Sequence, residues 1–408
     1  MMKKMVIGTL LLLFMLFLTS ETRALVGGND FFGLDFRFNN PGARANAMGG
    51  AFIGLADDAT AAYTNPAGLT ILTAPEVSAE YKYSEITTQI YDAIGSREFD
   101  DTVDGVSFIS FAYPSEGTTI TVFRHQLLNI ESDYDWFDES DEASDVNVEL
   151  EAVTLGIGLG VKLTETFSAG VSVNFTELQY DVLTLGYDDA AKTTLEEREN
   201  INDSDTAEHV TLSFLWNPVD TLSLGLVYRQ GPKFGSRKSR WSYVYLSPPD
   251  EFFWLQEWEL DNDLKVPDVF GLGLAYRFTP SFTLAADVNY VEYSDLVDNF
   301  KLDPGTTLQD DDFVIDDEFE FRVGLEYIFE AGRIPLAARA GYYFRPDHGV
   351  VYNGPDPLFR DILQERDDDD HIYSAGLGAV FDNVQIDLAG IYGDYIKELI
   401  LSLVYRFE

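Results

Sequence analysis

Hydrophobic and polar residues alternate with a period of two along most of the chain after Pro75. In residues 319–329, large apolar side chains occupy every odd position, and the positions between them carry glycine or charged side chains, apart from Ile328. The same alternation recurs in residues 270–278 and 399–408. A period of two indicates β-strands rather than helices. The chain is therefore predicted to be all-β, with one bulky apolar face and one small or charged face on each strand.

Short turns alternate with longer polar connections along this pattern. Six turns, at residues 114–117, 163–166, 217–220, 278–281, 330–333 and 381–383, would join twelve strands into hairpins. A first strand near residues 76–90 and a last one at residues 397–407 bring the expected number to fourteen. The longer connections are predicted at residues 91–102, 130–146, 184–205, 231–265, 296–317 and 346–370. An even number of strands of about 10 residues, with short turns on one side and long loops on the other, is typical of a transmembrane β-barrel, which lipid requires to be closed.

The first 24 residues have the pattern of an export signal. Lys3 and Lys4 precede an apolar stretch at residues 6–18, and Thr22 and Ala24 occupy the −3 and −1 positions of a cleavage site. This predicts a signal peptide at residues 1–24, because a membrane-spanning helix needs about 20 apolar residues. An exported chain is then either a secreted soluble protein or an outer-membrane barrel. We expect the outer-membrane barrel. Its expected partners are outer-membrane lipids and the barrel-assembly machinery, and it is expected to be a monomer.

The composition excludes several functions. The chain of 408 residues has 27 Lys and Arg against 70 Asp and Glu, a net charge of −43, so nucleic-acid binding is not expected. The absence of cysteine removes disulfides, thiolate metal sites and cysteine nucleophiles. The four histidines are scattered, so no enzyme is predicted. Carboxylates cluster in the predicted loops without the spacing of a calcium loop, so no metal and no cofactor is predicted, and solvated loops that reach lipid phosphates through divalent ions are the simpler interpretation.

Residues 25–74 do not alternate and are rich in glycine and alanine. Small residues allow short helices and turns to pack closely, and a plug is physically reasonable in a barrel wide enough to conduct water. The segment contains Ala56-Asp57-Asp58-Ala59 and Asn65-Pro66-Ala67. In these motifs, and in residues 266–277, 335–342 and 373–392, the chain resembles the FadL/TodX family of outer-membrane transporters for long-chain fatty acids and hydrocarbons.

The resemblance implies a 14-stranded barrel at residues 75–408 with an N-terminal hatch at residues 25–74, whose motif is Asn65, Pro66 and Ala67. It also implies passive uptake of a hydrophobic ligand, which is caught in an apolar extracellular groove, moves to a pocket near the hatch and leaves sideways at a kinked third strand. No glycine or proline marks such a kink within residues 118–129.

An aromatic loop is the candidate for the extracellular groove. An apolar loop on an acidic surface would suit a hydrophobic ligand, and folding of the loop onto the barrel rim is the alternative. The candidate ligand-binding residues in residues 231–265 are Trp241, Tyr243, Phe252, Phe253, Trp254 and Trp258.

Arginines at inward positions are candidates for lumen charges. Arg277, Arg322 and Arg339 could each hold the carboxylate of a fatty acid, or could pair with carboxylates of the barrel and the hatch, such as Asp57 and Asp58. Two functions remain open at this point. A continuous apolar path in the lumen would favour transport, whereas a charge-filled lumen would favour a non-transporting barrel that acts as a surface scaffold or as a shuttle for secreted proteins.

Overall fold

The computed structural model describes residues 38–92, 95–137, 143–187, 195–235, 244–247, 250–253, 263–297, 310–355, 357, 360, 363 and 369–407. The predicted signal peptide and the first part of the predicted hatch, residues 25–37, lie outside the described residues. No helix within the described residues is both long enough and apolar enough to cross a membrane.

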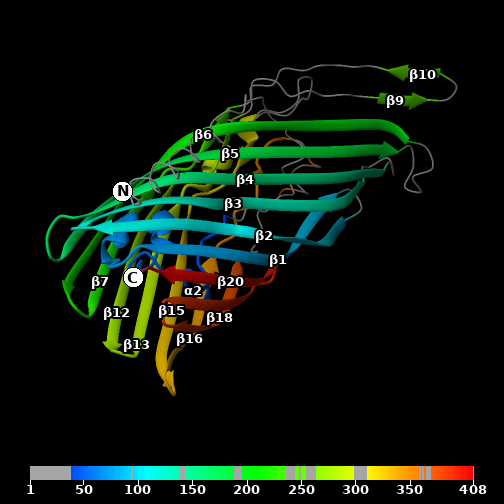
Figure 1. Cartoon of the computed structure of the whole chain (residues 1–408). Helices are drawn as coiled ribbons and strands as arrows, with labels where there is room; N and C mark the ends of the chain where they lie inside the picture. The colour runs from blue at the N-terminus through cyan, green and yellow to red at the C-terminus, as the bar shows by residue number, and fades with distance from the viewer. Residues whose placement is uncertain are drawn as a thin grey trace.

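Fourteen antiparallel strands form a closed barrel, in which the first strand pairs with the last (Figure 1). The predicted fold class and strand number are thus confirmed. The barrel strands are β1 (Glu76–Asp92), β2 (Gly95–Ser115), β3 (Thr118–Phe137), β4 (Ala143–Lys162), β5 (Phe167–Tyr187), β6 (Leu195–Val219), β7 (Leu222–Arg229), β12 (Val269–Thr279), β13 (Phe282–Val291), β15 (Glu318–Ala331), β16 (Ile334–Arg345), β18 (Asp370–Phe381), β19 (Val384–Tyr392) and β20 (Ile396–Arg406).

The outer face of the barrel carries its large apolar side chains. On β15, Phe319, Phe321 and Tyr327 are about half exposed, while Glu320 and Glu326 on the other face are buried. This is the reverse of a soluble sheet, because lipid rather than a protein core covers the apolar face. The alternation seen in the sequence therefore separates a lipid-facing side from a lumen-facing side.

The strands differ greatly in length, which corrects the prediction of long loops at residues 91–102, 130–146 and 184–205. β2 has 21 residues and β6 has 25, whereas β19 has 9. In Figure 1, β2–β6 extend well beyond the shorter strands. On the extension of β3 the inward residues Ile130 and Tyr134 are buried, and the outward residues Glu131 and Asp133 are exposed. Because these outward positions are charged rather than apolar, the sequence of this part of the strand resembles that of a polar loop.

The segment from residue 38 to residue 74, called here the N-terminal segment, contains three short helices: α2 (Ala43–Ala47), α3 (Ala61–Thr64) and η2 (Pro66–Ile71). Helix α2 contacts β16, β18, β19 and β20, and η2 contacts β2 to β6. The segment thus touches strands on widely separated parts of the barrel wall, and Figure 1 shows it in blue behind β2 and β3.

Short strand pairs and turns lie outside the barrel sheet. The pairs are β8 (Lys233–Gly235) with β11 (Asp263–Lys265), β9 (Val244–Ser247) with β10 (Asp250–Phe253), and β14 (Phe313–Val314) with β17 (Val351–Tyr352). Two 3-10 turns, η3 (Tyr293–Leu296) and η4 (Asp310–Asp312), complete the described elements. All of them follow strand ends on the side where the long connections were predicted.

Candidate functional site

The barrel wall supplies hydrogen-bond acceptors to the N-terminal segment. The Asp287 carboxylate accepts from the backbone N–H groups of Phe52, at 2.7 Å, and Ile53, at 2.9 Å. The Gly42 N–H donates to Glu80 Oε2 at 2.6 Å, and further along the segment the Gly49 N–H donates to Ser374 Oγ at 3.0 Å. Short helices leave most of their backbone groups without partners, and buried groups need them. These inward carboxylates and hydroxyls therefore anchor the segment.

The Asn65-Pro66-Ala67 motif begins helix η2. The Asn65 side chain is fully buried; its Oδ1 accepts from the Ala67 N–H at 3.1 Å, and its Nδ2 donates to Ile53 O at 2.7 Å. Pro66 occupies the first turn of the helix, where no backbone donor is needed. The motif thus caps one helix and holds the neighbouring turn at Ile53 with the same side chain.

Replacing Asn65 by alanine is expected to loosen the N-terminal segment. The change removes a helix cap and leaves the buried Ile53 carbonyl without its donor, a loss of about 1–3 kcal/mol. Limited proteolysis of the purified barrel should then cut within residues 38–74 faster than in the wild type. Asn353→Ala is the control, because Asn353 is exposed; equal protection of N65A and the wild type would contradict this role.

The three candidate lumen arginines occupy different environments. Arg322 and Arg339 lie on the lumen side, where Arg322 pairs with Glu320 at 2.8 Å and Arg339 pairs with Glu326 at 2.7 Å. Arg277 is exposed near the turn between β12 and β13. The structure brings Arg322 to the cavity described next, and it brings neither of the other two there.

A cavity of about 140 Å³ lies between the N-terminal segment and the barrel wall. Its apolar lining comes from Phe52 and Ile53 of the segment and from Val227 and Val269 of the wall. Glu320 contributes a polar side, where its carboxylate accepts hydrogen bonds from three groups: Tyr293 Oη at 2.8 Å, Tyr343 Oη at 2.6 Å and Arg322 Nη2 at 2.8 Å. An apolar cavity with a few polar groups is the usual form of a small-molecule site.

A second cavity, of about 30 Å³, adjoins the first along β1. Both cavities are lined by Asn39, Lys82, Ile396 and Glu398. Lys82 Nζ donates to Asn39 Oδ1 at 3.0 Å and lies 3.4 Å from Glu398 Oε1. The two spaces therefore meet at a narrow polar junction.

The second cavity lies where β2 and β3 separate. Within the described residues of these strands, pairing runs from Ser115–Thr118 to Phe108–His125 and ends there. A bulge at Leu127 follows in β3, and Val103 and Ile130 on either side of the separation line the cavity. The Asn39 N–H donates to Leu127 O at 2.9 Å, so the N-terminal segment occupies part of the free edge of β3.

Strands β2 and β3 approach each other again farther from the turn that joins them. Ser132 Oγ donates to Asp101 Oδ2 at 2.8 Å, and Arg97 Nη2 donates to Asp135 O at 2.5 Å. The separation of β2 and β3 is thus bounded on both sides by contacts between the two strands. The bulge in β3 lies at a leucine, so no glycine or proline marks it in the sequence.

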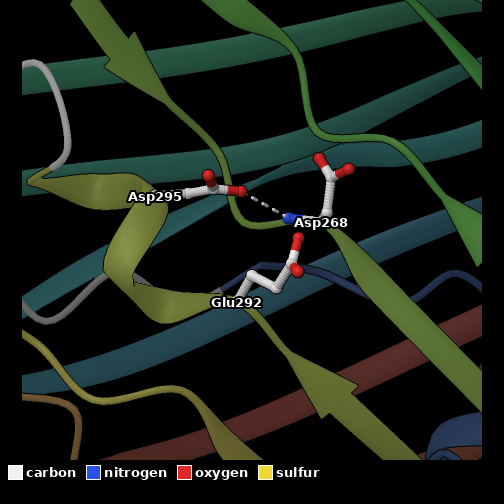
Figure 2. Close-up of side chains that lie close together, drawn as sticks. All are labelled: Asp268, Glu292 and Asp295. Atoms are coloured by element: carbon white, nitrogen blue, oxygen red, sulfur yellow. Dashed lines mark hydrogen bonds between the residues drawn. The ribbon is translucent and has the colours of Figure 1, made fainter.

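Three carboxylates, Asp268, Glu292 and Asp295, lie close together at the ends of β12 and β13 (Figure 2). The Lys265 ammonium lies among them, 2.6 Å from Asp295 Oδ2 and 3.2 Å from Asp268 Oδ1. Burial lowers the pKa of Lys265, but its hydrogen bonds to the two carboxylates outweigh burial and raise the pKa overall. One protonated lysine already pairs with two of the three carboxylates, and Asp268 also accepts a hydrogen bond from Tyr228 Oη at 2.6 Å, so the group is part of the framework.

Most of the aromatic groove residues predicted from the sequence are not described. Trp241, Tyr243, Trp254 and Trp258 lie outside the described residues, and Phe252 and Phe253 are placed only as backbone in β10. Sequence reasoning did not single out Lys82 or Arg229, although both line the larger cavity. The alternation of faces along β7 could have indicated Arg229, because Arg229 lies on the same face of this strand as Gly225 and Val227, which are buried.

A closed antiparallel barrel with an apolar outer face is a membrane-spanning barrel of the outer-membrane type. The profile of the family described as "Outer membrane protein transport protein (OMPP1/FadL/TodX)" matches residues 37–392. The chain belongs to this family of outer-membrane transporters of hydrophobic compounds, as its resemblance predicted. A search among curated proteins found no match.

Solved structures of similar fold agree with this assignment. A FadL homologue of Pseudomonas aeruginosa is 16% identical, with a TM-score of 0.64 over 92% of this chain and 100% of its own. The toluene transporter TodX of P. putida is 15% identical, with a TM-score of 0.62 over 90% and 99%. The CymD monoaromatic hydrocarbon channel is 15% identical, with a TM-score of 0.62 over 91% and 99%. At these identities the likeness establishes the fold.

Proposed function

We propose that this protein takes up hydrophobic molecules passively, either long-chain fatty acids or hydrocarbons, and releases them sideways into the outer membrane between β2 and β3. The observation that carries the proposal is the second cavity, which lies at the separation of the two strands and shares four lining residues with the larger cavity. A side exit suits an apolar molecule, because it leaves the lumen without entering water.

Buried apolar side chains lie near both ends of this route. One buried apolar cluster includes Phe52 and Tyr63 of the N-terminal segment together with Leu128 and Ile130 of β3. A hydrophobic ligand would therefore meet buried apolar side chains on both sides of the polar junction at Asn39, Lys82 and Glu398. The aromatic residues between Trp241 and Trp258 are the proposed landing site on the extracellular side.

We further propose that residues 25–74 act as the hatch of a barrel formed by residues 75–408. The lumen of a barrel of this size would otherwise admit water. Backbone contacts support this role: a Cβ placed on Gly273 of β12 would lie 2.4 Å from the Gly54 N atom, and one on Gly225 of β7 would lie 2.2 Å from Ile53 O. The wall thus carries glycine where the segment touches it.

Uptake of palmitate and toluene tests the proposal. Cells that lack their own channel for these compounds should take up at least one radiolabelled ligand faster when they express this protein. Val103→Trp is expected to return uptake to the background, because the larger ring fills the second cavity. Val106→Trp, whose side chain faces outward on the same strand, should behave as the wild type.

Two results would reject transport. One is uptake at the background rate in cells with the wild-type protein for both ligands. The other is co-purification of a secreted protein in a fixed ratio with a barrel that binds neither ligand, which would establish the shuttle function instead.

A further inference from the structure

The barrel closes at one seam, where β1 pairs with β20 from Glu76–Arg406 to Ile86–Ile396 (Figure 1). Every other pair of neighbouring barrel strands follows in chain order, so a turn or loop joins the two strands. The seam has no such connection, and an open sheet edge is costly in lipid, where no water satisfies its backbone groups. Contacts that hold the seam from the lumen side therefore matter for the whole barrel.

Polar side chains cross this seam on its lumen side. Arg406 Nε of β20 lies 2.7 Å from Glu76 Oε1 of β1. Farther along the seam, Glu80 of β1 lies opposite Ser402 of β20, whose hydroxyl donates to Glu80 Oε2 at 3.2 Å. Glu76, Glu80 and Ser402 are all buried. Buried polar groups need partners, and here strand pairing across the seam brings those partners together.

The Glu80 carboxylate collects hydrogen bonds from three separate parts of the chain. Its donors are Ser107 Oγ of β2 at 2.7 Å, Ser402 Oγ of β20 at 3.2 Å and the Gly42 N–H of the N-terminal segment at 2.6 Å. Ser107 is the unpaired residue of a bulge in β2 opposite Glu80. A buried carboxylate is costly unless donors surround it. The three donors meet only when the seam is closed and the segment is docked.

The N-terminal segment crosses the seam between two consecutive residues. Gly42 donates to Glu80 on β1, and the N–H of the next residue, Ala43, donates to Ser402 Oγ on β20 at 2.7 Å. The chain turns at Gly42, whose φ of 99° favours glycine. Helix α2 follows, and its Ala43 belongs to one buried cluster with Ile400 of β20. The segment therefore contacts both strands of the seam at once.

We propose that the N-terminal segment holds the seam closed, and that Glu80 and Ser402 couple its docking to the pairing of β1 with β20. Docking supplies donors to both side chains, and closure brings the two side chains together, so each event stabilises the other. Such coupling is reciprocal. Displacement of the segment therefore weakens the β1–β20 ladder from within. The coupling concerns the closure of the barrel and is independent of which ligand the channel carries.

Hydrogen exchange of the purified full-length barrel in detergent micelles, followed by mass spectrometry, tests the coupling from a distance. Gly341→Val lies on β16, outside the seam, and its side chain would overlap the Gly49 backbone of the segment. Amides of residues 76–86 and 396–406 are expected to exchange about tenfold or more faster than in the wild type. Residues 144–150 of β4, which pair with β3 and β5, should change by less than about twofold. Gly390→Val, with nothing within 4 Å of its Cβ, is the control and should match the wild type.

Glu80→Gln gives a second and milder test, because glutamine offers one acceptor oxygen in place of two. Exchange should rise together in residues 39–48 and at the seam, by about fivefold or more. Glu85→Gln is the matched control: it breaks the exposed pair with Lys397, which crosses the same seam on the outer face. It should change neither region by more than about twofold. Faster exchange of residues 39–48 in G341V with an unchanged seam, or a seam that loosens in E80Q while the segment keeps its protection, would overturn the coupling.

Discussion

Replacing Gly341 by valine is expected to displace the N-terminal segment and to leave an open barrel that conducts ions. A Cβ at Gly341 would lie 2.0 Å from the Gly49 N atom and 2.3 Å from the Met48 carbonyl carbon, and both are backbone atoms that cannot rotate away. Overpacking of this kind costs about 1–3 kcal/mol where a side chain can yield, and more where only backbone is present. Gly170 offers a second site of the same kind, because its Cβ would lie 2.1 Å from the Ala67 N atom.

Planar-bilayer conductance measures this outcome directly. The wild type should remain closed to small ions, while G341V and G170V should show large, long-lived open levels. Gly390→Val is the control, since nothing lies within 4 Å of a Cβ at that position. If G341V stays closed and its segment remains protected from protease, the contact at Gly341 does not hold the segment in place.

The strand number was predictable because two independent signals agree. Alternation marked each strand, and short turns marked where strands reverse, as at Gly117 and Gly332, which both have positive φ. The lengths of the strands could not be predicted from the same signals. Beyond the membrane the outward face meets water, so carboxylates such as Glu131 and Glu149, which lie opposite each other on β3 and β4, replace the apolar side chains. Strand and polar loop then have similar compositions.

Less of the site than of the fold could be predicted from the sequence. The alternation along the strand predicted that Glu320, Arg322 and Glu326 lie on the lumen side, because each is flanked by aromatic or aliphatic residues. The partners of the cavity arginines depend on residues that can be far apart in the sequence, since Arg229 lies over the ring of Tyr63 and Arg322 contacts Glu320 and the ring of Tyr343. The bulge at Leu127 likewise arises from pairing with β4 and leaves no local sequence signal.

Removing Glu326 is expected to cause the largest loss of stability in the barrel. Its carboxylate is buried between two arginines, with Arg44 Nε of the N-terminal segment at 2.8 Å and Arg339 Nε of β16 at 2.7 Å. Glu326→Leu would leave both guanidinium groups short of an anion in a buried site. Breaking such a pair from one side costs about 3–5 kcal/mol. The midpoint of unfolding in urea should fall accordingly, and protease should reach the N-terminal segment, because Arg44 loses one of its anchors.

A pair of controls separates buried charge from charge in general. Glu165→Leu removes a carboxylate that is 95% exposed beside Lys162 and should change stability by about 0.5 kcal/mol or less. The double variant E326L/R339M should be no more stable than E326L, because it also breaks the buried pair between Arg339 and Asp387 at 2.6 Å and leaves that carboxylate only its hydrogen bond from Gln385 Nε2 at 2.6 Å. An unfolding midpoint for E326L equal to that of E165L would show that the two arginines find other partners when Glu326 is absent, and that the network does not fix the segment to the wall.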